Sequence, residues 1–283
     1  KMDLSVLSRF KDVISDPLNN FIERHPLSGQ VEDGNVILHT GTKVPLTCYY
    51  NNFGEIFVLN RGVHEPLEEF VFQEFSKKLP ESPLMIELGA YWAHYSMWMK
   101  VVRPQATTIM FEPEIKALNI GKNNFSNNNF SGQFINGYFG NDPSYQKRGV
   151  PNYTIDNFLR DDNIEKLNVL HSDIQGSEYD MLVSSHHTLS NKNIDYLLIS
   201  THSQQLHFSV VDLLKKYDYI IEVSSDFDNE TTSVDGFIFA SSPLCQTIFD
   251  NFKPKGKNEI KDLNSSSLFE YLQNVHSFCS GNK

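Results

Sequence analysis

From residue 83 onward the chain alternates short apolar runs with stretches of helical periodicity, and this alternation limits the fold more than any other feature. The runs read "LMIEL", "TTIMFEP", "QFINGYFG", "LNVLHSD", "YLLIST", "YIIEVS" and "GFIFASS". Such short runs indicate strands that are buried on both faces, as in a parallel sheet covered by helices. The sequence therefore predicts an α/β domain.

The last two runs are joined only by "SDFDNETTSVD", which is too short and too polar to hold a crossover helix. Parallel neighbours need such a crossover, whereas antiparallel neighbours do not. We therefore expect these two runs to pair antiparallel at an edge of the sheet.

The regions on either side of this domain have a different character. Residues 3–25 carry apolar positions at helical spacing and predict a helical arm. Residues 35–60 contain β-branched and aromatic runs broken by glycine and proline, which predict a small antiparallel unit, and a helix is expected over 65–78. We thus expect an N-terminal helical arm with a small β unit (1–80), the α/β domain (81–243) and a C-terminal helical extension (244–283).

Composition excludes some classes of function. Acidic residues outnumber basic ones by 35 to 24, and a formal net charge of −11 argues against a broad surface for nucleic-acid phosphates. The three cysteines, Cys48, Cys245 and Cys279, are widely spaced, as is typical of reduced thiols. No apolar run approaches a membrane span of about 18 residues, and no secretory signal pattern is present. The sequence predicts a soluble, cytoplasmic protein with neither a nucleic-acid nor a membrane partner.

Polar residues end several of the predicted strands, where open α/β sheets bind their ligands. The first run ends at Glu87 and Gly89, and the second at Glu112. Glu112 is placed to accept hydrogen bonds from a ribose diol, and Gly89 lets the backbone approach a ligand closely. The helix expected near Tyr91 favours an anionic group at its amides. Glu87 can instead be a simple acid at a helix N-terminus.

The stretch "HSDIQGSEYDML" is the most specific motif. Here a strand ends at Asp173, Gly176 permits a sharp exit, and a helix follows. Asp173 and Gln175 are expected to project into the crevice together, with His171 and His202 converging from neighbouring strand ends. The simpler alternative is that Asp173 only caps the helix.

Four segments together resemble a known family. "IELGAYWAHYS", "FEPEIKALNIGKNN", "YTIDNFL" and "LHSDIQGSEYDMLVSS" occur in the order and spacing of the FkbM-type methyltransferases, which use S-adenosylmethionine. The resemblance covers approximately residues 84–240. It implies a class I methyltransferase Rossmann-like sheet, mostly parallel with the last strand antiparallel, and makes 81–243 the S-adenosylmethionine-binding domain.

The resemblance also implies which residues contact the cofactor. Glu87, Gly89 and Ala90 would surround its methionine moiety. Glu112 would bind the ribose, and Asp173 would lie near the transferred methyl group. The adenine would lie along "INGYFGN", which contains Asn136 and Gly137, and the predicted cofactor site is completed by Tyr91, Ser96 and Pro113.

The chain departs from the family pattern at three positions. Tyr91 stands where the family usually has Asn, and Ala93 where it usually has Gly, so the cofactor loop is less open. Gln175 replaces the usual acid, which removes a negative charge beside the active centre.

Methyl transfer from a sulfonium is an in-line displacement, and holding donor and acceptor together can supply about 7–11 kcal/mol. A hydroxyl acceptor must also lose a proton, so a base is expected. His202 is the preferred base, with Asp173 orienting it or the acceptor, and His207 is the second choice. Gln175 and His171 are predicted to contact the acceptor. A divalent metal on Asp173, His202 and His171 is the alternative, because imidazole and carboxylate are suitable ligands.

The sequence therefore predicts a methyltransferase that uses S-adenosylmethionine and acts on a hydroxyl, or a carboxylate, of a small molecule, glycan or modified peptide. N-methylation of a peptide side chain and a non-catalytic module with the same fold remain as alternatives. The aromatic residues of the N-terminal region either line an acceptor pocket or form a core. A homo-oligomer is compatible with the sequence.

Overall fold

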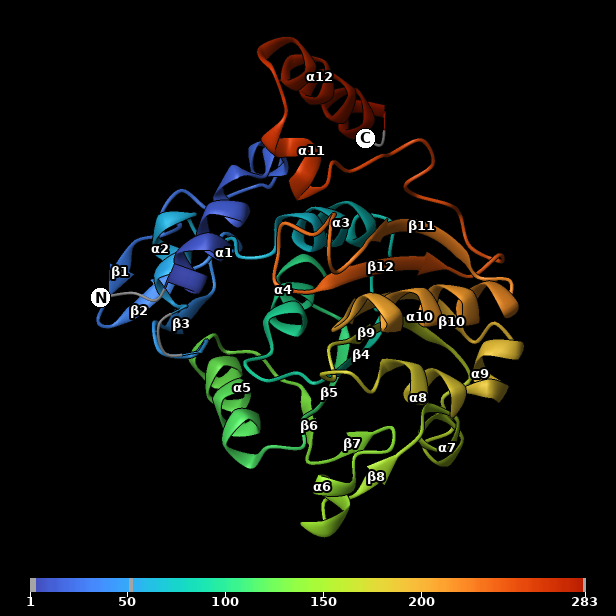
Figure 1. Cartoon of the computed structure of the whole chain (residues 1–283). Coiled ribbons are helices and arrows are strands. Elements are labelled where there is room, and N and C mark those ends of the chain that lie inside the picture. Colours follow the sequence, from blue (N-terminus) through green and yellow to red (C-terminus); the bar gives the residue numbers. More distant parts are fainter. Residues whose placement is uncertain (1–3, 51–52, 282–283) are drawn as a thin grey trace. The chain divides into compact units, whose positions relative to one another are not determined.

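The computed structural model describes residues 4–50 and 53–281 (Figure 1). Packing divides the chain into two compact units, which are described separately. The first unit comprises Lys1–Lys78, Ser225–Asp235 and Ile248–Lys283, and the second comprises Leu79–Ser224 and Gly236–Thr247.

The second unit is built on a seven-stranded sheet whose order, within the described residues, is β11-β12-β10-β9-β4-β5-β6. The pairs β10·β9, β9·β4, β4·β5 and β5·β6 are parallel, and β12 is antiparallel to β10. The predicted mostly parallel sheet with an antiparallel last strand is thus confirmed. Its strands are β4 (Leu84–Leu88), β5 (Thr107–Phe111), β6 (Gln133–Ile135), β9 (Leu167–Ser172), β10 (Ile194–Thr201), β11 (Ile220–Ser225) and β12 (Gly236–Ser241).

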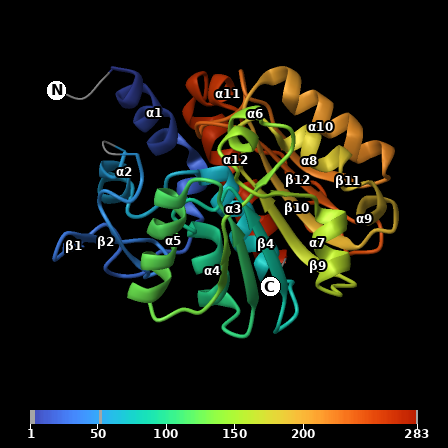
Figure 2. The ribbon, with the colours of Figure 1, turned by 90° about the horizontal axis from the view of Figure 1, so that it is seen from below.

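Burial explains why these runs form strands. Every residue of β10 and β12 is buried, and β4 is buried over all but its first residue. Figure 2 shows α4 and α5 on one side of the sheet and α8 and α10 on the other. Both faces are therefore covered, as the unbroken apolar runs require. The helices of this unit are α4 (His94–Val102), α5 (Ile115–Asn127), α6 (Pro143–Lys147), α7 (Ile155–Asp161), α8 (Glu178–Val183), α9 (His186–Ser190) and α10 (Gln204–Lys216).

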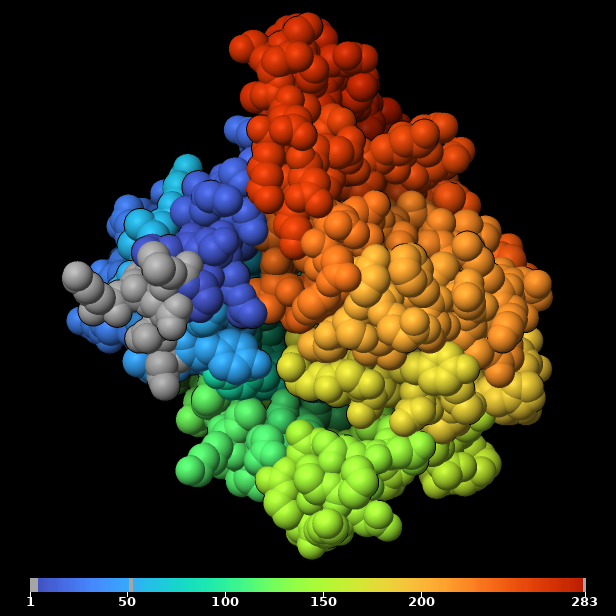
Figure 3. Space-filling model, viewed as in Figure 1, coloured from blue at the N-terminus to red at the C-terminus, as the bar shows by residue number. Residues whose placement is uncertain are grey.

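A short excursion follows β6. It consists of β7 (Tyr138–Phe139), α6 and β8 (Asn152–Tyr153), and β7 and β8 pair in parallel. The side chain of Asp142 caps α6 by accepting the Ser144 N–H at 2.7 Å. In the space-filling view the excursion forms a continuous yellow-green surface (Figure 3).

The first unit contains a three-stranded antiparallel sheet, which confirms the predicted small antiparallel unit. Its strands are β1 (Val31–Glu32), β2 (Asn35–Ile37) and β3 (Lys43–Pro45). Its helices are α1 (Leu4–Ser15), the 3₁₀ turn η1 (Pro17–Asn20), α2 (Glu55–Leu59), α3 (Pro66–Ser76), α11 (Lys257–Lys261) and α12 (Ser265–Gly281).

Two predictions for this unit are wrong in part. The helical arm ends at Ser15 rather than near residue 25, because Asp16 accepts the Leu18 N–H at 2.8 Å and begins a separate turn with Pro17. Residues 55–59, expected in strands, form α2, since periodicity does not separate a short apolar helix from a strand. Residue 3 of the arm and residues 51–52 of the β region lie outside the described residues.

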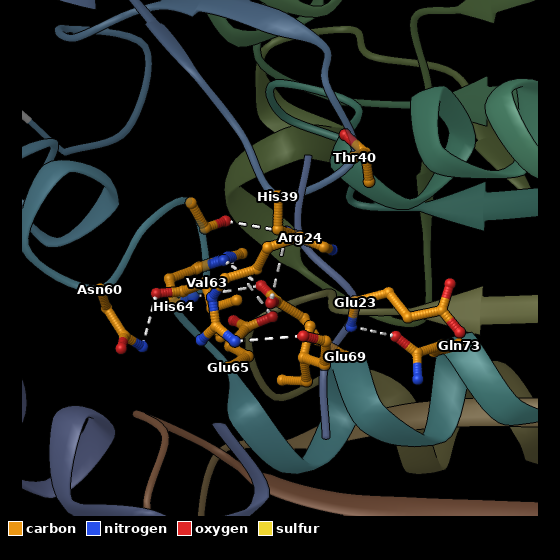
Figure 4. A network of polar contacts seen from close by, with 12 residues as sticks. Glu23, Arg24, His39, Thr40, Asn60, Val63, His64, Glu65, Glu69 and Gln73 are labelled. Carbon is orange, nitrogen blue, oxygen red and sulfur yellow. Dashed lines mark hydrogen bonds and ion pairs between the residues drawn. The ribbon is translucent and has the colours of Figure 1, made fainter. Parts of the chain in front are cut away.

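A buried polar network ties α3 to the preceding segments of the first unit (Figure 4). Glu69 is fully buried, and its Oε1 lies 2.6 Å from Nδ1 of His64. His39 Nδ1 lies 2.9 Å from the carbonyl oxygen of Gly62, and burial lowers the pKa of this imidazole. Gln73 accepts the Glu23 N–H at 2.7 Å. The network satisfies a carboxylate that would otherwise be costly to bury.

None of the helices in the described part of the chain combines the length and apolarity that a membrane crossing requires.

Candidate active site

A pocket opens at the carboxyl ends of β4, β5, β6 and β9. It encloses about 440 Å³ of space that is partly open to solvent. Six of the residues predicted to form the site line it, namely Gly89, Glu112, Pro113, Gly137, Asp173 and Gln175. The excursion after β6 supplies the aromatic part of the lining, with Tyr138, Phe139 and Tyr145.

Gly89 sits where the turn after β4 touches the end of β9. Its φ is +72°, and an added Cβ would lie 1.8 Å from the carbonyl oxygen of Asp173. The N–H groups of Gly89 and Ala90 both donate to the carbonyl oxygen of Phe111, at 2.9 and 3.0 Å. The turn thus joins the ends of three strands, and only glycine fits at its first position.

Tyr91 and Ala93, two of the three departures from the family pattern, adopt left-handed backbone conformations, with φ of +45° and +62°. Such conformations cost a residue with a Cβ roughly 1–2 kcal/mol. The Asn and Gly usual in the family adopt them more easily. Here the turn is held by the Tyr91 N–H, which donates to Glu112 Oε2 at 3.0 Å, and by the Ala93 N–H, which donates to the carbonyl oxygen of Ala90 at 2.6 Å.

Glu112 follows β5 and is almost fully buried. Its Oε1 accepts the Glu114 N–H at 2.9 Å, and burial raises the pKa of its carboxyl group. Asn136 donates from Nδ2 to the carbonyl oxygens of Glu112 and Pro113, at 3.0 and 2.8 Å. A carboxylate offers about four acceptor positions, so Glu112 retains capacity for two further hydroxyl groups. Asn136 holds the strand end in place and does not itself line the pocket.

Glu87, Ser96 and His171 lie together but are not among the residues that line the pocket. Glu87 Oε2 accepts the Ser96 N–H at 3.0 Å at the start of α4, and burial raises the pKa of Glu87 to about 7. His171 Nδ1 is 4.0 Å from Glu87 Oε1, and its ring centroid is 4.4 Å from that of Tyr95. Burial lowers the pKa of His171 to about 4, so its ring is neutral at physiological pH.

Asp173 lines the pocket, and His202, which is not among the lining residues, contacts Asp173. Nε2 of His202 lies 3.0 Å from Asp173 Oδ1, which also accepts a hydrogen bond from Gln175 Nε2 at 2.8 Å. The other ring nitrogen of His202, Nδ1, lies 3.0 Å from Oε1 of Glu178. His202 is therefore placed between two carboxylates.

These contacts set the charges of the group. Burial alone would lower the pKa of His202, but the bonds to Asp173 and Glu178 outweigh it and raise that pKa to about 11. Burial likewise would raise the pKa of Asp173, but the hydrogen bond and charge of His202 lower it below its usual value. At neutral pH His202 is therefore an imidazolium beside the carboxylate of Asp173.

His207 has other partners. Its Nδ1 lies 2.9 Å from Thr201 Oγ1 and its Nε2 lies 2.9 Å from Ser224 Oγ, and the residue is buried. The structure thus gives the ring of His207 partners other than Asp173. Among the described residues, His171, His202 and Asp173 do not form a cluster whose ligand atoms could share a metal ion.

Glu178 is a site residue that reasoning from the sequence missed. The sequence predicts only that a helix follows Gly176, and Glu178 is the first residue of that helix, α8. The sequence signal lies in the motif itself, because "HSDIQGSE" places an acid five residues after Asp173. Only the fold shows that this acid turns back to His202.

The strand order, the antiparallel β12 and the pocket at the carboxyl ends of the parallel strands define a class I methyltransferase domain. The profile of the methyltransferase FkbM domain matches residues 114–221. This match agrees with the resemblance to the FkbM-type methyltransferases that the motifs indicate.

Several solved structures are similar to the chain. Methyltransferase FkbM from Methylobacillus flagellatus KT is 18% identical with a TM-score of 0.43, and the match covers 57% of this chain and 44% of that one. TrmK of M. capricolum, solved with S-adenosyl-homocysteine, is 14% identical with a TM-score of 0.40, over 74% and 93% of the two chains. A putative rRNA-methylase from Clostridium thermocellum is 9% identical with a TM-score of 0.44, over 60% and 92%. No curated protein matches the chain significantly.

Proposed function

We propose that this protein transfers a methyl group from S-adenosylmethionine to an oxygen atom of a small molecule, a glycan or a modified peptide. The supporting observation is the pocket itself. The Gly89 turn, the Glu112 carboxylate and Asp173 all line this pocket, which lies at the edge of a class I methyltransferase sheet. Ligands of such sheets bind at this edge.

The residues present fit the cofactor. Glu112 retains acceptor capacity for the two ribose hydroxyls. Gly89 lines the pocket, where its backbone can contact the methionine moiety. The adenine would lie near Gly137, against the rings of Tyr138 and Phe139, since aromatic rings favour stacking. Glu87 does not line the pocket and instead accepts the Ser96 N–H near the start of α4.

When bound, S-adenosylmethionine supplies an electrophilic methyl group on a sulfonium sulfur. The Asp173–His202 pair is proposed as the base. Because His202 is already protonated, the carboxylate of Asp173 is the group that receives the acceptor's proton. The donors from His202 and Gln175 both use Oδ1, which leaves Oδ2 for the acceptor.

The charge of the pocket favours one class of acceptor. Among the described residues that line it, two are carboxylates, Glu112 and Asp173, and none is Lys or Arg. An anionic acceptor would meet like charge, which is unfavourable at close range. A hydroxyl is thus favoured over a carboxylate. A peptide amine also suits these carboxylates, and N-methylation is the second candidate.

Calorimetry with S-adenosylmethionine tests the proposal. Glu112→Gln and Glu112→Ala should weaken binding about 10- to 150-fold, because a hydrogen bond to a charged group is worth about 1.5–3 kcal/mol. Glu114→Gln is the matched control, since this acid stands two residues away, is exposed and pairs with Arg148. The control should bind like the wild type. Wild-type protein that is folded and gives no binding would favour the non-catalytic module.

A second assay separates the two acceptor classes. The protein is incubated with S-adenosylmethionine carrying a ¹³C-labelled methyl group and with alcohol, glycan and peptide pools. NMR of the labelled product then distinguishes a methyl group on oxygen from one on nitrogen. Label found only on nitrogen would replace O-methylation by the second candidate.

A further inference from the structure

Glu178 has no place in the proposed chemistry so far, yet it is a fully buried carboxylate next to the pocket. Its Oε1 lies 3.0 Å from His202 Nδ1 and accepts the Ile174 N–H at 3.0 Å. Its Oε2 accepts the Gly176 N–H at 3.1 Å. Burying a carboxylate costs free energy unless hydrogen-bond donors satisfy it, and these contacts supply the donors.

Both groups that bond to Asp173 are placed by Glu178. It holds the ring of His202 directly. Gln175 stands between Ile174 and Gly176, whose N–H groups Glu178 fixes. Gln175 has a φ of +54°, which is unfavourable for a residue with a Cβ and persists only where neighbouring contacts enforce it.

We propose that Glu178 is a positioning residue of the methyl-transfer site, which fixes His202 and the loop 174–176 so that Asp173 presents Oδ2 to the acceptor. This inference rests on the proposed function, because it assumes that the site transfers a methyl group. Glu178 is not among the residues that line the pocket, so it acts through His202 and Gln175. The geometry agrees with this role, because the two ring nitrogens of His202 lie 3.0 Å from Asp173 Oδ1 and 3.0 Å from Glu178 Oε1.

The test compares Glu178→Gln, which removes the charge and keeps the shape, with Asp180→Asn. Asp180 lies two residues further along the same helix, so its side chain points to a different face from that of Glu178. ¹⁵N NMR of the imidazole nitrogens, with the His202 signals assigned from a His202→Asn sample, reports ring protonation. Glu178→Gln should lower the protonation midpoint of His202 by about one to three pH units, and Asp180→Asn should leave it unchanged. An unchanged midpoint in folded Glu178→Gln overturns the role.

A second readout separates positioning from cofactor binding. Glu178→Gln should bind S-adenosylmethionine within about twofold of wild type, because the carboxylate does not face the pocket. A wild type that binds no S-adenosylmethionine overturns the proposed function, whereas an unchanged His202 midpoint overturns only the role of Glu178. If Glu178→Gln does not fold, the wild-type spectrum decides. His202 should stay protonated up to about pH 9, and a midpoint near its usual pKa of 6.5 refutes the inference.

Discussion

Gly89→Ala should damage the protein more than an ordinary glycine substitution. The added Cβ would lie 1.8 Å from the carbonyl oxygen of Asp173, and real Cβ atoms essentially never approach closer than 3.0 Å. The two groups must therefore separate by at least 1.2 Å. That movement would strain the hydrogen bond at the end of the sheet, in which the Asp173 N–H donates to the carbonyl oxygen of Leu88 at 3.0 Å.

Two costs add in this variant. Alanine in the left-handed region costs roughly 1–2 kcal/mol, and forcing extra atoms into a packed site costs about 1–3 kcal/mol. Gly149→Ala separates them, because Gly149 has a φ of +70° and nothing within 4 Å of an added Cβ. Gly149→Ala has the same cost of a left-handed backbone and the same effect on the unfolded chain as Gly89→Ala. Its added Cβ, however, overlaps no other atom.

Urea denaturation followed by circular dichroism measures both variants. We expect Gly89→Ala to lose about 1–3 kcal/mol more free energy of unfolding than Gly149→Ala. We also expect it to lose S-adenosylmethionine binding in calorimetry, whereas Gly149→Ala retains it. A difference in unfolding free energy below about 0.5 kcal/mol would refute the close approach of Gly89 to the backbone of Asp173.

Two further predictions concern buried polar residues. The raised pKa of Glu87, about 7 against a usual 4.5, means that its carboxylate destabilises the fold as the pH rises through this window, and the stability is regained at lower pH. Glu87→Gln should therefore gain roughly 3 kcal/mol over wild type between pH 4.5 and pH 8 in urea denaturation, and parallel pH curves would contradict this. His207→Ala should lose about 2–4 kcal/mol of unfolding free energy, because it removes a buried ring and leaves Thr201 and Ser224 without their partner. The affinity of His207→Ala for S-adenosylmethionine should stay within about twofold of wild type. A loss of binding in the folded variant would show that His207 contributes to the active site.

The sheet could be predicted from the sequence because burial on both faces leaves a plain pattern. A strand such as β10, buried at every position, reads as an unbroken apolar run. The loop between β11 and β12 is too short for a crossover helix, and this predicted that the two strands are neighbours at an edge of the sheet, as they are. The short run at 55–59 was misjudged as a strand because its few apolar residues satisfy either period.

The candidate site could be predicted only in part, since the sequence shows which acids end strands but not where they point. Glu87 lies within β4 and turns to the start of α4, whereas Glu112 follows the end of β5 and faces the pocket. His171 and Asp173 are two residues apart, yet the strand ends between them and they find different partners. The link between Glu178 and His202 depends on how α8 meets the end of β10, which no local pattern encodes.

A crystal structure with bound S-adenosyl-homocysteine tests the central claim most directly. The account predicts that both ribose hydroxyls lie within hydrogen-bonding distance of the Glu112 carboxylate. It also predicts that the sulfur faces Asp173, with His202 still between Asp173 and Glu178. A ligand that binds away from the Gly89 turn, or a pocket that stays empty at saturating ligand, would contradict the account.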